Sequence, residues 1–140
     1  MNKRLLILGA GEMQVPVIRK ANDMGLHTIV ADMDANAPGM GYASEPVLVS
    51  TMDKEGVLEC AKRHSVDGIL TTSDAPVNVV SYVGEQLGLP SMSTEVAKIC
   101  TNTCRGKCLR PTGLMYHFSC FVIKIRTWAH CKIIHILSNR

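Results

Sequence analysis

Short apolar runs alternate with amphipathic segments along the first hundred residues of the chain. The run from Leu5 to Leu8 is unbroken, which is typical of a parallel strand covered on both faces. Similar runs, rich in β-branched residues, predict strands at residues 28–32, 46–49 and 68–72. The spacing of apolar residues predicts helices at 12–24, 54–64, 75–87 and 93–100. The pattern therefore indicates an α/β protein.

The order of these elements predicts a Rossmann-like, doubly wound parallel sheet. The connections are short, so helices should cover both faces of the sheet through right-handed crossovers. Residues 34–43 are dominated by Gly, Pro and Asn and form a loop or a short irregular helix. Residues 89–91 form a short connection or an edge strand. A chain of 140 residues allows one ordinary domain with its own core.

Several residues define the helix ends and the buried helix faces. Pro16 suits a first helical turn, Gly25 a left-handed C-terminal cap, and Asp53 an N-cap, while Ser93 or Thr94 can cap the last helix. Cys60 is interpreted as a small core residue rather than a reactive thiol. The expected buried faces are Met13, Val17, Ile18, Ala21 and Met24; then Val57, Leu58, Cys60 and Ala61; then Val77, Val80, Val83 and Leu87.

The first strand ends in a glycine turn that leads directly into the first helix. Gly9 and Gly11 allow a sharp turn and a close approach of ligand to backbone. Asp32 ends the second strand, about twenty residues on, where dinucleotide-binding folds place a ribose-binding acid. The dinucleotide fingerprint has a third glycine where this chain has Gln14. Both dinucleotide binding and contact with another ligand remain open at this turn.

The ends of the strands, at Gly9, Asp32 and residues 72–74, should converge on one edge of the sheet and form the ligand crevice. Each acid there also has a structural alternative. Glu12 could favour the N-terminus of the first helix, Asp32 could cap the following turn, and Asp74 stands where an N-cap would precede the third helix.

Charge divides the chain near residue 101. Residues 1–100 carry 8 Lys and Arg and 12 Asp and Glu, whereas residues 101–140 carry 7 Lys and Arg and no acid. We therefore expect a domain at 1–100 and a tail at 101–140 that is non-native sequence or poorly ordered. The apolar content of 46% is that of a globular protein, and no run is long enough for a signal peptide or a membrane span. A cytoplasmic location is expected.

The tail contains residues that could suggest metal or nucleic-acid binding. Cysteines at 100, 104 and 108 are followed by further Cys and His residues. Their spacing matches neither zinc-binding C-x-x-C arms nor the usual iron–sulfur runs, so no metal site is expected. The basic residues are interleaved with aromatic residues in no stacking pattern, so nucleic acid is not an expected partner.

Three segments resemble the domain that precedes the ATP-grasp fold. Residues 8–13, Leu-Gly-Ala-Gly-Glu-Met, are similar to the Gly-x-Gly-Glu-Leu turn of purine-synthesis enzymes. Residues 32–40 resemble their Asp-x-x-x-Asn-Ala-Pro-Ala segment, and residues 89–102 resemble the lead into the ATP-grasp domain. Such domains open formate-dependent phosphoribosylglycinamide transformylase, carboxyaminoimidazole ribonucleotide synthetase, biotin carboxylase and the repeats of carbamoyl phosphate synthetase.

The resemblance implies the substrate side of an ATP-dependent carboxylate–amine ligase, truncated before its ATP-binding domains. Glu12, Met13 and Asp74 match positions that bind the acceptor substrate in the purine enzymes, and Gly9, Gly11 and Asp32 complete the expected binding set. Gln14 and Asp74 depart from the family's glycine and glutamate. The intact enzymes use ATP and magnesium, but this chain alone is expected to bind neither and to contain no catalytic residue. A small-molecule acceptor is the expected partner, no membrane is expected, and a homo-oligomer is left open.

A reading-frame error is our hypothesis for the tail. Its lack of acids beside frequent Cys, His and Arg is unusual for a folded segment. Back-translation with a shift of one base allows a Gly-Ile-x-Val-Pro turn that resembles the family's continuation. The DNA sequence across Asn102 would test this hypothesis.

Overall fold

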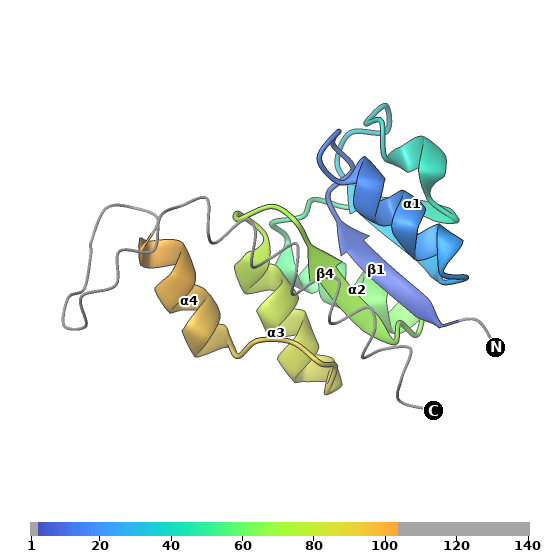
Figure 1. The fold of residues 1–140 in the computed structure, drawn as a ribbon. Helices are drawn as coiled ribbons and strands as arrows, with labels where there is room; N and C mark the ends of the chain where they lie inside the picture. Colours follow the sequence, from blue (N-terminus) through green and yellow to red (C-terminus); the bar gives the residue numbers. More distant parts are fainter. Residues whose placement is uncertain (1–2, 104–140) are drawn as a thin grey trace.

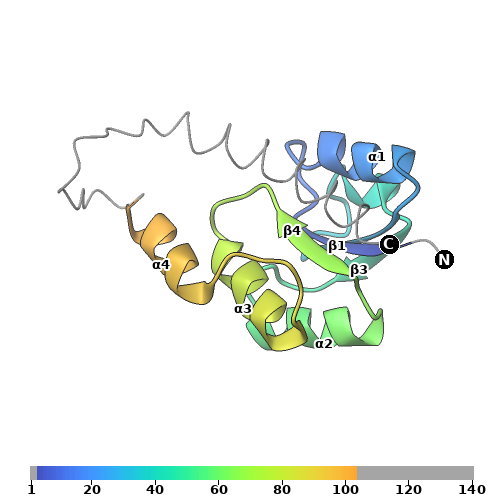
Figure 2. The same ribbon diagram turned by 60° about the horizontal axis from the view of Figure 1, so that its bottom comes forward.

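The computed structural model describes residues 3–103, in which a four-stranded parallel sheet lies between two layers of helices (Figures 1 and 2). The strands are β1 (Arg4–Leu8), β2 (His27–Asp32), β3 (Glu45–Leu48) and β4 (Gly68–Thr71). The helices are α1 (Val15–Asp23), α2 (Lys54–Arg63), α3 (Val77–Leu87) and α4 (Thr94–Thr103), together with the short 3₁₀ helix η1 (Met40–Tyr42). Residues 104–140, which contain most of the tail's Cys and His residues and the segment of the frameshift hypothesis, lie outside the described residues.

The strand order β3-β2-β1-β4 is that of a doubly wound fold, as the sequence predicts. Strand β1 lies in the middle and pairs in parallel with both β2 and β4. Leu6, for example, is paired with Ile29 on one side and Ile69 on the other. The carboxyl ends of β1, β2 and β4 therefore lie along the same edge of the sheet.

The unbroken apolar run of β1 supplies two separate hydrophobic cores. Leu5 and Ile7 point to the face covered by α1, where they join Ile18 and Ala21. Leu6 and Leu8 point to the opposite face, which α2 and α3 cover (Figure 2). Successive strand residues face opposite sides of a sheet, so a strand buried on both faces needs apolar residues throughout.

The α2 and α3 faces are buried as predicted, with Leu87 partly buried, and Cys60 is a core residue. Asp53 caps α2 by accepting a hydrogen bond from the Gly56 N–H at 3.1 Å. Gly25 follows α1 with a φ of +75°, which confirms the left-handed cap. Ser93 accepts a hydrogen bond from the Val96 N–H at the start of α4.

The prediction that the first helix begins at Glu12 is wrong. The Gly11 carbonyl accepts a hydrogen bond from the Gln14 N–H at 3.0 Å, so residues 11–14 form a turn before α1. Met13 lies in this turn and is 74% exposed, so it is not part of the buried face. Other boundaries shift less: β3 begins one residue earlier than expected, α4 continues to Thr103, and residues 89–91 form a connection without strand pairing.

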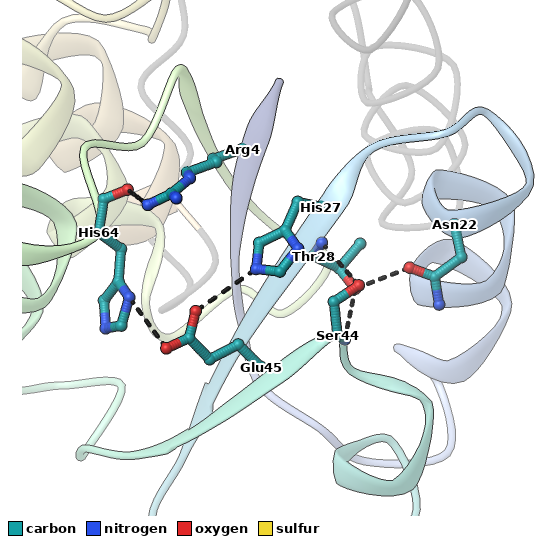
Figure 3. Close-up of polar contacts among 7 residues, drawn as sticks. All are labelled: Arg4, Asn22, His27, Thr28, Ser44, Glu45 and His64. Carbon is teal, nitrogen blue, oxygen red and sulfur yellow. Dashed lines mark hydrogen bonds and ion pairs between the residues drawn. The ribbon is translucent and has the colours of Figure 1, made fainter. Parts of the chain in front are cut away.

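The amino-terminal ends of the strands are joined by a polar network that sequence analysis did not predict (Figure 3). The Glu45 carboxylate lies between His27, with Nε2 at 3.4 Å, and His64, with Nδ1 at 3.3 Å. A guanidinium nitrogen of Arg4 donates to the His64 carbonyl at 2.7 Å. These contacts connect β1, β2 and β3 with the residue that follows α2, at the edge opposite the glycine turn.

Candidate functional site at the carboxyl edge of the sheet

The glycine turn after β1 is held by backbone hydrogen bonds to the neighbouring strand and loop. Gly9 has a φ of +100°, a conformation that favours glycine, and its N–H donates to the Ala31 carbonyl at 2.9 Å. The Ala10 carbonyl accepts a hydrogen bond from the Gly39 N–H, which brings the loop after β2 against the turn. The turn is therefore a fixed part of the fold.

Asp32 holds the turn with its carboxylate. Oδ2 accepts a hydrogen bond from the Ala10 N–H at 2.7 Å, and Oδ1 accepts one from the Asp34 N–H at 3.1 Å. The second bond is the turn-capping alternative that the sequence left open. Both oxygens are thus used by the backbone, although each retains a lone pair for a ligand. Ligand binding by Asp32 stays a prediction.

Gln14 is a site residue whose role sequence analysis missed. Its side chain is only 5% exposed, and its Nε2 donates to Thr72 Oγ1 and to Ser73 Oγ, both at 2.8 Å. These hydroxyls follow β4, so Gln14 connects the turn after β1 with the turn after β4. Two sequence signals pointed here: the departure from the third glycine, and the Thr-Thr-Ser run at residues 71–73.

The carboxylates of two acids at this edge have no hydrogen-bond or ion-pair partner among residues 3–103. Glu12 is exposed on the turn before α1, where the later helix start puts it outside the first helical turn. Asp74 is half-buried after β4. Its predicted alternative as an N-cap is wrong, because Pro76 occupies the cap of α3 and no side chain caps that helix.

The arrangement suits a ligand with an amine or another hydrogen-bond donor. Glu12, Asp32 and Asp74 bring three carboxylates to one edge of the sheet, and exposed Met13 adds an apolar surface. Within residues 3–103, no group of three or more His, Cys, Asp or Glu side chains could hold a metal ion. None of the helices in this part of the chain is long and apolar enough to cross a membrane.

Comparisons with known proteins point to one superfamily. Over 99 residues the chain is 31% identical to the formate-dependent phosphoribosylglycinamide formyltransferase of Synechococcus sp. (strain WH7803), a match that covers 70% of this chain and 25% of that protein. The enzyme of the same name from Wolinella succinogenes is 35% identical over 72 residues, or 51% of this chain and 19% of that protein. The chain thus spans about a quarter or less of these relatives. No protein-family model matches it.

Solved structures show the same fold. Phosphoribosylglycinamide synthetase from Anaerococcus prevotii matches with a TM-score of 0.67 and 28% identity, over 75% of this chain and 27% of that one. N5-carboxyaminoimidazole ribonucleotide synthetase from Thermotoga maritima matches with a TM-score of 0.59 and 21% identity, over 69% and 27%. The second likeness concerns the fold alone. Together these matches confirm the resemblance seen in the sequence: the described part of the chain is similar in sequence and in fold to the N-terminal domain of ATP-grasp ligases.

Proposed function

We propose that residues 1–100 form the acceptor-binding domain of an ATP-dependent carboxylate–amine ligase. In this proposal Glu12, Met13 and Asp74 contact the acceptor, while Gly9, Gly11 and Asp32 shape the turn on which it lies. ATP and magnesium are bound by parts of the enzyme outside this domain. The relatives support the proposal, because those matched in sequence are named as enzymes acting on phosphoribosylglycinamide.

The observation that carries the proposal is the contrast between paired and unpaired acids. Asp32, Asp53 and Asp67 each accept a hydrogen bond from a backbone N–H of the fold. The carboxylates of Glu12 and Asp74 accept none within residues 3–103, although these residues follow the two neighbouring strands β1 and β4. A half-buried carboxylate such as Asp74 loses hydration and needs a hydrogen-bond partner. A ligand with an amine would supply that partner to both acids.

The test is a titration of the isotope-labelled 140-residue chain with phosphoribosylglycinamide, followed by the amide signals in NMR spectra. We expect the signals of Glu12, Met13 and Asp74 to shift. Replacing one acid, in Glu12→Gln or Asp74→Asn, should weaken binding about tenfold or more, because a hydrogen bond to a charged group contributes about 1.5–3 kcal/mol.

Two exposed acids away from this edge serve as matched controls. Glu95→Gln, in the first turn of α4, and Asp23→Asn, at the end of α1, remove one charge each and should leave binding unchanged. Titrations with NAD and ATP test the rival interpretation, a stand-alone nucleotide- or dinucleotide-binding module. Micromolar binding of NAD at the glycine turn, or no binding of any of these compounds, would contradict the proposed function.

A further inference from the structure

Gln14 covers the glycine turn from outside. A Cβ atom built on Gly9 would lie 3.4 Å from Cδ of Gln14, and one built on Gly11 would lie 3.1 Å from its Oε1. The open sides of both glycines therefore face the carboxamide of Gln14. In dinucleotide-binding turns, glycines leave room for a pyrophosphate to approach the backbone. Here a side chain of the protein already fills that room.

The carboxamide is held in this position by a chain of hydrogen bonds. Its Nε2 donates to the hydroxyl groups of Thr72 and Ser73. The Ser73 N–H donates to Thr71 Oγ1 at 3.1 Å, and that hydroxyl donates to the Leu8 carbonyl at 3.0 Å. The first of these bonds ties the loop after β4 to the end of that strand, and the second ties the end of β4 to the end of β1. Displacing Gln14 would break two hydrogen bonds at a site with little exposure to water, which has a cost in free energy.

We propose that Gln14 is a specificity-determining residue that closes the glycine turn to phosphate groups and positions the loop carrying Asp74. An acceptor then meets the carboxylates of Glu12 and Asp74 instead of the backbone N–H groups of the turn. The part of this inference that concerns the acceptor rests on the proposed function. The closure of the turn does not rest on the proposed function. It gives a physical role to Gln14, which stands where the fingerprint has its third glycine.

The first experiment compares pyrophosphate binding to the full 140-residue chain and to its Gln14→Ala variant, by calorimetry and by NMR signals of the residue 9–11 amides. The wild-type amides should not respond. The variant should bind at least about tenfold more tightly and show shifts at these amides, because one regained hydrogen bond to a charged group is worth a factor of this size. Gln86→Ala, which removes an exposed carboxamide from α3, is the matched control and should behave like the wild type.

Gln14→Glu keeps the turn filled with a side chain of nearly the same shape and adds a negative charge. This variant should therefore also fail to bind pyrophosphate. The proposal would be overturned if pyrophosphate shifted the residue 9–11 amide signals of the wild type and bound it as tightly as Gln14→Ala. It would also be overturned if Gln14→Ala folded but bound pyrophosphate no more tightly than the wild type.

A measurement on the unmodified chain keeps the proposal testable if Gln14→Ala does not fold. The side-chain NH₂ protons of Gln14 should exchange with water much more slowly than those of exposed Gln86 and should show contacts to Thr72 and Ser73. Equal exchange rates would contradict the proposal. Failure of phosphoribosylglycinamide to bind, with slow exchange and pyrophosphate exclusion intact, would refute the proposed function but leave the closed turn in place.

Discussion

At the scale of single residues, Thr71 links the two turns of the candidate site. Its hydroxyl is buried, donates to the Leu8 carbonyl and accepts from the Ser73 N–H. Thr71→Val keeps the branched shape but removes both bonds and leaves polar backbone groups without this partner. We expect the free energy of unfolding to fall by about 1–2 kcal/mol, as measured by urea denaturation.

Thr51→Val is the matched control for this substitution. Thr51 lies in the connection before α2, is partly exposed, and its hydroxyl has no hydrogen-bond partner among residues 3–103. The change should therefore alter the stability by no more than a few tenths of a kcal/mol. Equal effects of the two substitutions would show that the Thr71 hydroxyl does not stabilise the two turns.

Cys60 gives a second prediction at the residue scale. Burial raises the pKa of its thiol, the nearby Glu45 raises it further, and Arg63 partly opposes this. Because the thiolate is the reactive form, Cys60 should react slowly with iodoacetamide at about pH 8, where an ordinary cysteine is partly ionised. Mass spectrometry of the native and the denatured chain measures this directly. Alkylation of Cys60 at the same rate in both states would contradict the prediction.

Residue roles could be predicted from the sequence where the partner is close along the chain. The Asp53 cap and the Asp32 turn bond join residues two or three positions apart, within reach of local rules. The hydrogen bond between Gln14 and Thr72 joins residues 58 positions apart, and it depends on β1 and β4 being neighbours in the sheet. No local pattern specifies such a contact, which is why Gln14 could be noticed as a departure but not explained.

At the scale of elements, Glu85 connects the end of α3 to the start of α4. One carboxylate oxygen accepts from the Thr94 N–H and the other from the Thr94 hydroxyl, both at 2.6 Å. These bonds lower the pKa of Glu85. Glu85→Ala should therefore reduce the hydrogen-exchange protection of the Ala97 amide, which bonds to the Ser93 carbonyl in the first turn of α4.

The lowered pKa also gives this contact a defined pH dependence. A carboxylate with a lowered pKa in the folded state stabilises the fold above its ordinary pKa, about 4.3 for glutamate. The contribution is lost as the pH falls through the lowered pKa, because the protonated group accepts more weakly. Wild-type α4 should thus lose protection on acidification, whereas Glu85→Ala should show no such step. Gln86→Ala should behave as the wild type does.

The elements themselves could be predicted because their apolar periods are strong. All four strands were expected within one residue of their observed bounds at each end, as were both ends of α2. The start of α1 could not be predicted, because the turn at residues 11–14 carries polar and apolar residues in a helix-like order. Met13 continues that order, yet the turn leaves it exposed.

At the scale of the whole molecule, the two edges of the sheet differ in how their acids are used. At the amino-terminal edge, Glu45 pairs with two histidines (Figure 3). The Asp67 carboxylate there accepts a hydrogen bond from the Arg4 N–H. At the carboxyl edge, Glu12 and Asp74 have no such partners within the part of the chain that is described. The sequence predicted the convergence at the carboxyl edge because parallel topology requires it. It did not predict the amino-terminal network, whose members come from three strands and the segment after α2.

This division leads to a prediction about activity. Acyl-phosphate chemistry needs magnesium held by carboxylates, and cations on the phosphoryl group that is transferred. The carboxyl edge offers acids but, within residues 3–103, no cluster able to hold a metal, and residues 101–140 contain no Asp or Glu. We therefore expect the 140-residue chain alone to hydrolyse no ATP. Phosphate release should stay at the blank level with ATP, magnesium and phosphoribosylglycinamide, while a full-length formyltransferase serves as the positive control. Release that disappears in Asp32→Asn or Asp74→Asn would mean that this domain binds the nucleotide itself.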